Sequence, residues 1–151
     1  MTDPEVEAFL REPHHLQVAT IGPDGRPHLV AMWYGFLDGA LALWTYGRSQ
    51  KVVNLRRDPR LTCLAEAGRA YDELKGVELV ARATILEDAA SVLRAGESVF
   101  DRYMGPFSEA DRPRLERMSA KRVAVRVDVE RVVSWDHAKL AGRPASSDGR
   151  P

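Results

Sequence analysis

The sequence predicts a mainly β protein of the α+β class, built as a six-stranded antiparallel barrel with peripheral helices. Two observations carry this prediction. Six stretches rich in β-branched and aromatic residues have the composition of strands, and several follow one another at hairpin spacing. Turn signals separate neighbouring stretches, the clearest being Gly22-Pro23-Asp24-Gly25 and Asp38-Gly39. The longer helical patterns come late in the chain, which is typical of helices added around a sheet.

The predicted strands alternate with short turns and helices along the chain. They cover residues 16–21, 26–37, 40–46, 60–67, 74–86 and 121–135. The second of these, 26–37, is apolar at both its odd and its even positions, so we expect it to be covered on both faces. The last alternates valines with Ala124, Arg126, Asp128 and Glu130, as a half-buried strand does.

Four helices are expected, each with a local start or stop signal. They cover residues 4–11, 49–57, 87–104 and 108–118. Thr2 or Asp3 can cap the first helix, and Asp58-Pro59 ends the second because proline disfavours the α conformation in the residue before it. Ser108, with Asp111 three residues later, predicts a capping box for the fourth.

Composition and charge narrow the class of protein. Of the 151 residues, 29% are charged and 44% hydrophobic, which is ordinary for a soluble globular domain. The formal net charge is zero, so no global field favours nucleic acid or an anionic membrane. No apolar run approaches the roughly 18 residues of a membrane span. We expect one domain over residues 1–140, and a disordered tail at 141–151 because those residues are small and polar.

Cysteine usage and the first residues favour a cytoplasmic protein without a metal site. Cys63 is the only cysteine, so no intrachain disulfide can form, and its apolar surroundings predict a small buried side chain. No cysteine–histidine spacing typical of zinc is present. The stretch from Met1 to Glu5 has neither a basic nor an apolar leader region.

The predicted turn between Tyr46 and Val52 has an unusual charge pattern. Helix starts carry positive partial charge and favour acidic residues, each worth about 0.3–1 kcal/mol. Here the first turn has no acid, while Arg48 and Lys51 add two cations and Ser49 can act as N-cap. This arrangement becomes favourable when an anion sits on the free N–H groups, which predicts a phosphate site. The alternative is a solvated turn whose two cations extend into water.

Three stretches together resemble the split β-barrel flavoproteins related to pyridoxamine 5′-phosphate oxidase. They are Gly25-Arg26-Pro27-His28 leading into Leu29–Tyr34, the hairpin into Trp44-Thr45, and Ser49-Gln50-Lys51. The resemblance covers roughly residues 5 to 136 in element order and spacing. The strand 27–34 and the helix 51–60 look closer to the branch of the family that binds the deazaflavin coenzyme F420 instead of FMN.

The resemblance implies a cofactor site and an assembly. Family members bind the cofactor between the subunits of a homodimer, with its ring along the second strand and its phosphate at the turn. Arg48 is included among the cofactor-binding residues because of the charge pattern at the helix start. The implied cofactor-binding residues are Leu29, Val30, Ala31, Met32, Trp33, Tyr34, Trp44, Thr45, Arg48, Ser49, Gln50 and Lys51.

The sequence departs from the oxidase itself at the positions that grip the FMN phosphate. Pyridoxamine 5′-phosphate oxidase has basic residues where this chain has Leu29, Tyr34 and Gln50. Losing two or three charge-assisted bonds, each worth about 1.5–3 kcal/mol, disfavours the same FMN pose. The resemblance therefore implies an F420-dependent reductase that transfers a hydride to a planar conjugated acceptor, such as a quinone-like, enone-like or tetrapyrrole compound.

Two rival functions and several residue roles stay open at this point. One rival is an FMN-dependent oxidoreductase on the same fold; the other is a non-catalytic carrier of a cofactor, haem or lipid. No catalytic residue is identified. His28, Tyr34 and Tyr46 are possible proton donors or structural residues. Arg56, Arg57 and Arg60 can hold an anionic cofactor tail or serve the fold, and Trp33 and Trp44 can contact the ring or fill the barrel.

Overall fold

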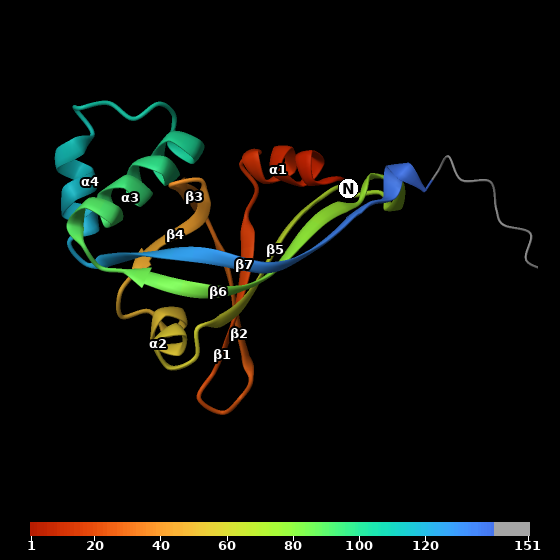
Figure 1. Ribbon diagram of the computed structural model, residues 1–151. Helices are drawn as coiled ribbons and strands as arrows, with labels where there is room; N and C mark the ends of the chain where they lie inside the picture. Colours follow the sequence, from red (N-terminus) through yellow and green to blue (C-terminus); the bar gives the residue numbers. More distant parts are fainter. Residues whose placement is uncertain (141–151) are drawn as a thin grey trace, which may run out of the picture.

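The computed structural model describes residues 1–140; the predicted disordered tail at 141–151 lies outside the described residues. Over that range the chain forms one seven-stranded sheet and four α-helices (Figure 1). The helices are α1 Asp3–Arg11, α2 Gln50–Arg57, α3 Ala89–Met104 and α4 Arg112–Ser119, with short 3-10 turns at Tyr71–Glu73 and His137–Lys139. The strands are β1 Leu16–Ile21, β2 Pro27–Met32, β3 Tyr34–Leu37, β4 Ala40–Tyr46, β5 Arg60–Ala67, β6 Lys75–Leu86 and β7 Arg122–Asp136.

The α+β class and the antiparallel split barrel are confirmed, but the strands number seven instead of six. The predicted strand over 26–37 is interrupted at Trp33, which separates β2 from β3. In the sheet order β2-β1-β5-β6-β7-β4-β3 these two strands form opposite edges. Because a single residue joins them, the sheet curls until its two edges come together at Trp33. The opening of the split barrel lies at this residue.

The turns between strands follow the local sequence. Asp38 and Gly39 have φ of 52° and 83°, the left-handed values that a two-residue type I′ hairpin requires. They connect β3 to β4 with Leu37 opposite Ala40. All strand pairs in the sheet are antiparallel, and the longest pairing joins β6 to β7. The hairpin predicted at Asp38-Gly39 is therefore confirmed.

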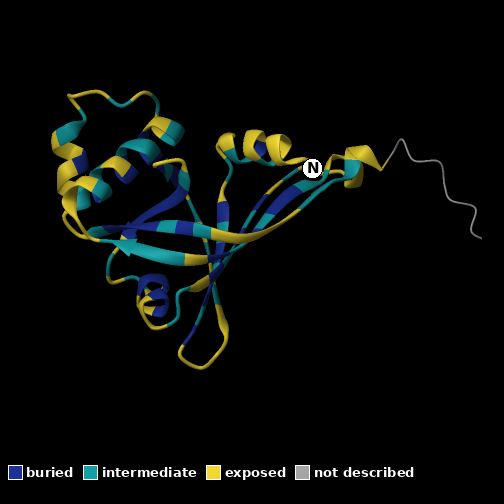
Figure 2. Cartoon of the chain, viewed as in Figure 1, coloured by how far each residue is buried: buried dark blue, intermediate teal, exposed yellow. Residues whose placement is uncertain are grey.

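One core fills the inside of the barrel, and two helices close it. Phe9 of α1 and Val52 and Leu55 of α2 belong to the same buried cluster as the inward side chains of the strands. Figure 2 colours parts of both helices as buried, like much of the sheet. In Figure 1, α1 lies above the sheet and α2 below it. Burying each large aliphatic side chain contributes about 1.5–3 kcal/mol, so both helices are held by the barrel core. The first turn of α2 thereby gains a defined position.

A second, smaller core packs α3 and α4 against β4 and β7. It contains Trp44 together with Val92, Ala95, Val99, Leu115 and Ala124. Gly96 allows this close approach, because a Cβ there would lie 2.9 Å from Cε2 of Trp44. This core fixes α3 beside β4, so that α3 forms one wall of a cleft next to that strand. No helix within residues 1–140 is long and apolar enough to cross a membrane.

The helix starts agree with the predictions except at α4. Thr2 is the N-cap of α1, and its N–H donates to the Glu5 carboxylate at 2.6 Å. The capping box predicted at Ser108 is wrong, since α4 begins at Arg112 with Asp111 as N-cap. The Ser108 hydroxyl instead donates to the Asp111 carboxylate at 2.6 Å and closes the turn before the helix.

Candidate functional site

The turn between β4 and α2 is held rigidly against β7. The Gly47 N–H donates to the Lys121 carbonyl at 3.0 Å, and the Ser49 N–H donates to the Tyr46 carbonyl at 3.0 Å. A Cβ on Gly47 would lie only 3.2 Å from Val123, so the small residue permits the close approach. The first turn of α2 has no acidic residue, as the sequence indicates. Its first N–H groups have no acceptor within the helix.

Ser49 is the N-cap of α2, but its hydroxyl does not cap the helix. An N-cap serine usually accepts a hydrogen bond from an N–H two or three residues later. Here the side chain makes no such bond, and Oγ is buried with no partner in residues 1–140. The predicted position of the cap is confirmed, whereas the expected bond is absent. The hydroxyl and the first-turn N–H groups are thus available to a common ligand.

Lys51 is a buried cation without a counter-ion. Its side chain lies in the second position of α2 and the residue is 9% exposed. Within the described chain, no carboxylate lies within 4.0 Å of its Nζ, and it makes no hydrogen bond. Burial, and next the neighbouring Arg122 guanidinium, lower the pKa of Lys51. An unpaired buried charge is costly, so an anion at this point would be strongly favoured.

Arg122 brings a second cation to the same place from the beginning of β7. Its guanidinium lies 4.2 Å from the ring centroid of Trp44 and 4.2 Å from that of Tyr46. The Nε atom is buried and has no partner within residues 1–140, while Nη1 donates to the Trp44 carbonyl at 3.4 Å. Sequence reasoning missed this residue, because only the pairing of β4 with β7 places Arg122 opposite Tyr46.

Together these groups have the donor set of a phosphate site. A buried hydroxyl on Ser49 and an ammonium on Lys51 lie at the start of α2, with the guanidinium of Arg122 close enough to act on Lys51, and within residues 1–140 no acid pairs with any of them. Phosphate oxygens accept such charge-assisted bonds, and backbone N–H groups at a helix start add to them. The residues therefore fit the phosphate of a flavin or deazaflavin. We call this group the anion cradle.

A cleft of about 490 Å³ lies next to the anion cradle and shares Arg122 with it; Trp44, on whose ring Arg122 lies, also lines the cleft. Its walls are mainly aromatic rings and methionine side chains, and none of its lining residues is acidic. The lining residues are His15, Ala31, Met32, Trp33, Trp44, Val99, Phe100, Met104, Met118 and Arg122. Apolar clefts of this size bury flat ring systems well, with a few polar groups setting the orientation.

Four of the implied cofactor-binding residues line this cleft, and three more shape the turn. Those in the cleft are Ala31, Met32, Trp33 and Trp44; those in the turn are Arg48, Ser49 and Lys51. Arg48 is exposed. Gln50 is exposed too, and its amide nitrogen donates to Oδ1 of Asn54 at 2.9 Å.

The remaining implied residues face other directions. Leu29 is exposed on the outer face of β2, Val30 is half-buried, and Thr45 is buried. Tyr34 is fully buried, and its hydroxyl donates to the Leu10 carbonyl at 2.9 Å. Burial raises the pKa of Tyr34 to about 12, so this side chain serves the fold and does not supply protons to the cleft. Only its backbone remains for a cofactor contact.

Several other polar residues named by the sequence have structural partners. Arg56 pairs with Glu87, and Arg57 donates to the Ile21 carbonyl. Arg60 pairs with Asp58 at 2.6 Å. Each of the three arginines therefore has a partner within the described chain, and a role for them at an anionic cofactor tail stays a prediction.

Cys63 is fully buried, and burial raises the pKa of its thiol to about 12, as expected for an inert core residue.

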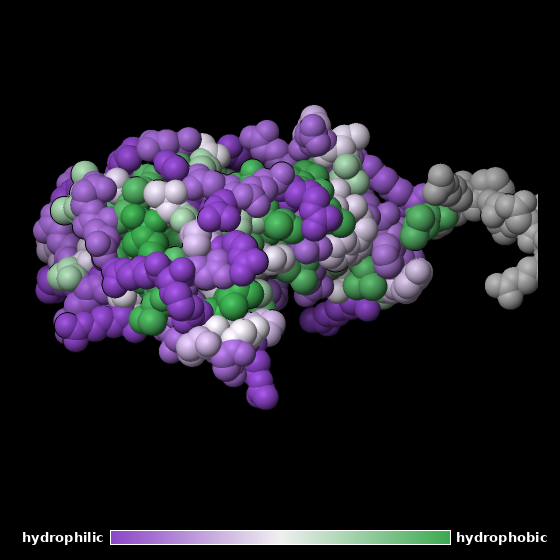
Figure 3. Space-filling model, turned by 60° about the horizontal axis from the view of Figure 1, so that its bottom comes forward, coloured by the Kyte–Doolittle hydropathy of each residue, from purple (hydrophilic) through white to green (hydrophobic). Residues whose placement is uncertain are grey.

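Apolar side chains also reach the surface away from the cleft. Figure 3 shows them as several patches between hydrophilic residues, on the face turned forward from the bottom of Figure 1. The outer face of β2 exposes Leu29 at 64%, and β7 exposes Val129, Val132 and Val133 at 38–46%. A groove of about 710 Å³ between α1 and the sheet adjoins Val129 and Val132.

A model of the pyridoxamine 5′-phosphate oxidase family matches residues 2–136. This chain belongs to that family. The matched range includes all seven strands of the split barrel and the residues of the cleft and of the anion cradle.

A named relative and two solved structures are similar to this chain over most of its length. The chain is 30% identical to an F420H(2)-dependent biliverdin reductase of Mycobacterium tuberculosis over 128 residues, which span 83% of this chain and 82% of that protein. The solved structure of the conserved hypothetical protein Rv2991 from the same organism is 45% identical, with a TM-score of 0.90, over 99% of this chain and 93% of that chain. A structure named F420 reductase is 25% identical, with a TM-score of 0.62, over 84% and 94%.

Proposed function

We propose that this protein is an F420-dependent reductase that transfers a hydride to a planar conjugated small molecule. The names of two similar proteins, an F420H(2)-dependent biliverdin reductase and an F420 reductase, support the choice of cofactor. The family match supports an oxidoreductase of the split-barrel type. The expected cytoplasmic location stays a prediction.

The anion cradle is the observation that carries the proposal. Lys51 and Arg122 are close enough to depress the pKa of the lysine, and no acid compensates them in the described chain. Leu29, Tyr34 and Gln50 stand where the oxidase has cations, so the cradle uses a different set of donors from the FMN grip of that enzyme. A phosphate bound by Ser49, Lys51 and Arg122 would give partners to the two buried unpaired atoms of the cradle, Oγ of Ser49 and Nε of Arg122.

The chain's own residues would hold and enclose the reactants. Reduced F420, when bound, supplies a hydride to an electron-poor acceptor. Trp33 and Trp44 provide flat walls at the cleft, while Met32, Phe100 and Met118 exclude water beside them. Holding the two reactants in contact supplies much of the rate acceleration in such reactions, so no dedicated acid is required for the hydride step. His15 is the ionisable cleft residue from which a proton could come.

We also propose a homodimer with the cofactor between the subunits. The outer face of β2 presents Pro27, Leu29 and Ala31 to solvent in the single chain, although the sequence predicts cover on both faces. β2 is an edge strand beside the cleft, so a second copy packed there would cover these side chains and close the site. Sedimentation equilibrium tests this: we expect twice the 16.8 kDa chain mass, and a monomer at micromolar concentration would refute it.

Side-by-side titration with F420 and FMN tests the cofactor. We expect F420 to bind at least tenfold more tightly than FMN, followed by oxidation of reduced F420 in the presence of a quinone acceptor. Purified protein that carries FMN, or binds it more tightly, would instead favour an FMN oxidoreductase. Tight binding without any hydride transfer to a panel of acceptors would favour a carrier.

A further inference from the structure

Trp33 occupies a special position in the barrel. It lies between β2 and β3, where the two edges of the sheet come together, and it lines the cleft. Its side chain is 44% exposed, far more than that of Trp44 in the opposite wall at 8%. Trp33 is thus a large aromatic side chain exposed at an apolar cleft, the kind of surface on which ligand rings bind.

Tyr103 covers one face of this indole. The two ring centroids lie 4.8 Å apart with an angle of 4° between the ring planes, which is a parallel stack. Because Tyr103 lies against one face of the ring, the 44% of the Trp33 side chain that is exposed belongs to the other face and to the ring edge, and the side chain lines the cleft. A third flat ring can therefore extend the stack from the cleft side.

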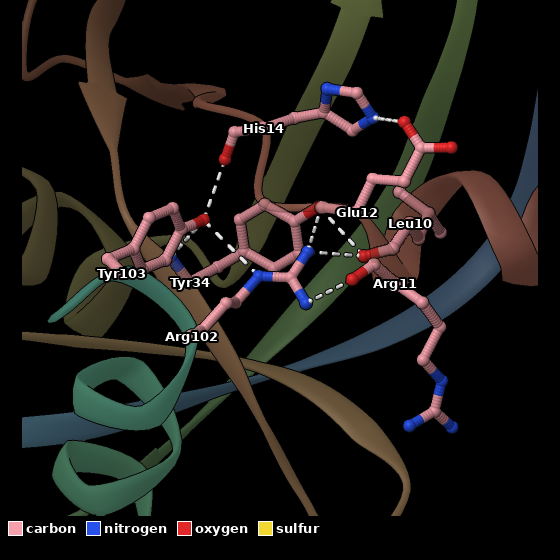
Figure 4. A network of polar contacts seen from close by, with 7 residues as sticks. All are labelled: Leu10, Arg11, Glu12, His14, Tyr34, Arg102 and Tyr103. Carbon is pink, nitrogen blue, oxygen red and sulfur yellow. Dashed lines mark hydrogen bonds and ion pairs between the residues drawn. The ribbon is translucent and has the colours of Figure 1, made fainter. Parts of the chain in front are cut away.

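Tyr103 itself is fixed by a network of polar contacts (Figure 4). Its hydroxyl donates to the His14 carbonyl at 2.6 Å and accepts from the Tyr34 N–H at 3.4 Å. It also accepts from Nε of Arg102 at 3.4 Å. Two of these partners lie far from Tyr103 in sequence, before β1 and at the start of β3, so the bonds fix the position of the phenol oxygen and hence of the ring.

Arg102 ties this network to the end of α1. Its guanidinium donates to the Leu10 carbonyl at 2.6 Å and to the Arg11 carbonyl at 2.9 Å, and it also bonds the Glu12 carbonyl. It lies 4.3 Å from the ring centroid of Tyr34. A cation near the last carbonyls of a helix is favourable, so the Arg102 guanidinium also stabilises the end of α1. α1, the β2–β3 junction and α3 are joined at this point (Figure 4).

We infer that Trp33, backed by Tyr103, is the stacking platform for the acceptor, and that Tyr103 and Arg102 are positioning residues which hold the platform in place. This inference rests on the proposed reductase function and adds a residue-level reason for a planar acceptor. A preformed platform loses little side-chain entropy when the acceptor binds. Flat conjugated rings gain from the stack, whereas small non-aromatic enones do not.

Kinetics with two acceptors test the platform. The acceptors are 2-methyl-1,4-naphthoquinone, which is flat and bicyclic, and cyclohex-2-en-1-one, which is not aromatic. In Trp33→Leu we expect the KM for the naphthoquinone to rise about tenfold and that for the enone less than twofold. Trp33→Phe keeps a ring and should stay within about threefold of the wild type for both. Equal KM changes for the two acceptors in Trp33→Leu would overturn the platform.

Variants of Tyr103 separate positioning from general support of the fold. Tyr103→Leu should raise the KM for the naphthoquinone about threefold or more, leave kcat and the F420 dissociation constant within twofold, and remove the near-ultraviolet circular dichroism of the stacked pair. Tyr103→Phe restores the ring and should recover most of that signal. Tyr71→Leu removes a tyrosine that is 72% exposed outside the cleft lining and serves as the matched control. A loss of kcat and cofactor affinity as large as the change in KM would refute the positioning role.

A binding measurement without F420 distinguishes this inference from the proposed function. The naphthoquinone quenches tryptophan fluorescence, and we expect its dissociation constant to be about tenfold higher for Trp33→Leu than for the wild type. If F420 does not bind but this difference is present, the reductase proposal fails and the platform stands. If F420 binds but the difference is absent, the platform fails and the reductase proposal stands.

Discussion

Removing the ammonium of Lys51 should weaken cofactor binding strongly without unfolding the protein. The lysine is 9% exposed and has no counter-ion in the described chain, so the perturbation is Lys51→Ala. A hydrogen bond to a charged group is worth about 1.5–3 kcal/mol. At about 1.4 kcal/mol per factor of ten, the loss corresponds to a dissociation constant roughly 10- to 150-fold higher.

Thermal shift measurements give a second view of the same change. A ligand at about 100 times its dissociation constant stabilises the native state by about 2.7 kcal/mol, or roughly 5–10 °C in Tm for a chain of this length. A variant with about fiftyfold weaker binding, at the same ligand concentration, retains only about 0.7 kcal/mol, or roughly 1–3 °C. Without ligand, Lys51→Met should melt no lower than the wild type, because it removes a buried unpaired charge and keeps the length of the side chain.

The assay is fluorescence titration with F420, accompanied by Lys121→Ala as matched control. Lys121 is an exposed lysine directly before Arg122, so its loss removes the same charge nearby without altering the anion cradle. We expect less than a twofold effect from the control, since solvent screens an exposed charge. Affinity of Lys51→Ala within twofold of the wild type would refute the anion cradle.

Four further outcomes follow from particular residues. Ser49→Ala removes a hydroxyl with no partner in the described protein, so Tm without ligand should be unchanged while F420 affinity falls about two- to tenfold. Gly96→Val overpacks the contact between α3 and the indole in the cleft wall and should cost about 1–3 kcal/mol in denaturant unfolding. Cys63 should not react with thiol reagents at pH 8 until the protein unfolds, as a buried thiol with a pKa of about 12 predicts. The hydrogen bond from Arg60 lowers the pKa of Asp58 to about 2. The stability that this bond contributes is complete above the pKa of the unfolded carboxyl and is lost as the pH falls toward 2. Arg60→Ala should therefore raise the titration midpoint of the Asp58 carboxyl measured by NMR.

Local features of the fold could be predicted because a few neighbouring residues decide them. The Asp38-Gly39 turn follows from residues that accept positive φ, and the end of α2 follows from Asp58-Pro59. The break at Trp33 could not be predicted, since both halves of the stretch are apolar and Gly35, two residues later, does not mark its position. Closure of the barrel, a long-range effect, puts the break there.

The candidate site likewise has residues that the sequence predicted and residues that it did not. Its turn, with Arg48, Ser49 and Lys51, was visible as a helix start with the wrong charges. The resemblance pointed to the strand 29–34, of which the structure brings three residues into the cleft. Arg122 and Tyr103 were missed, because each meets the site through a contact with a segment about 70 or more residues away in sequence.

The sequence by itself determined the class of fold, most of the helices and strands, and the cationic turn, since backbone preferences, side-chain periodicity and helix-end charges act over a few residues. Only the tertiary structure decided which polar side chains are buried next to one another. Within residues 1–140 it left the Ser49 hydroxyl and Nε of Arg122 buried without partners, placed the largely buried Lys51 beside them with no counter-ion, and stacked Tyr103 behind Trp33. Burial and strand register depend on the packing of the whole chain, and the affinity of the site for an anion depends on that burial.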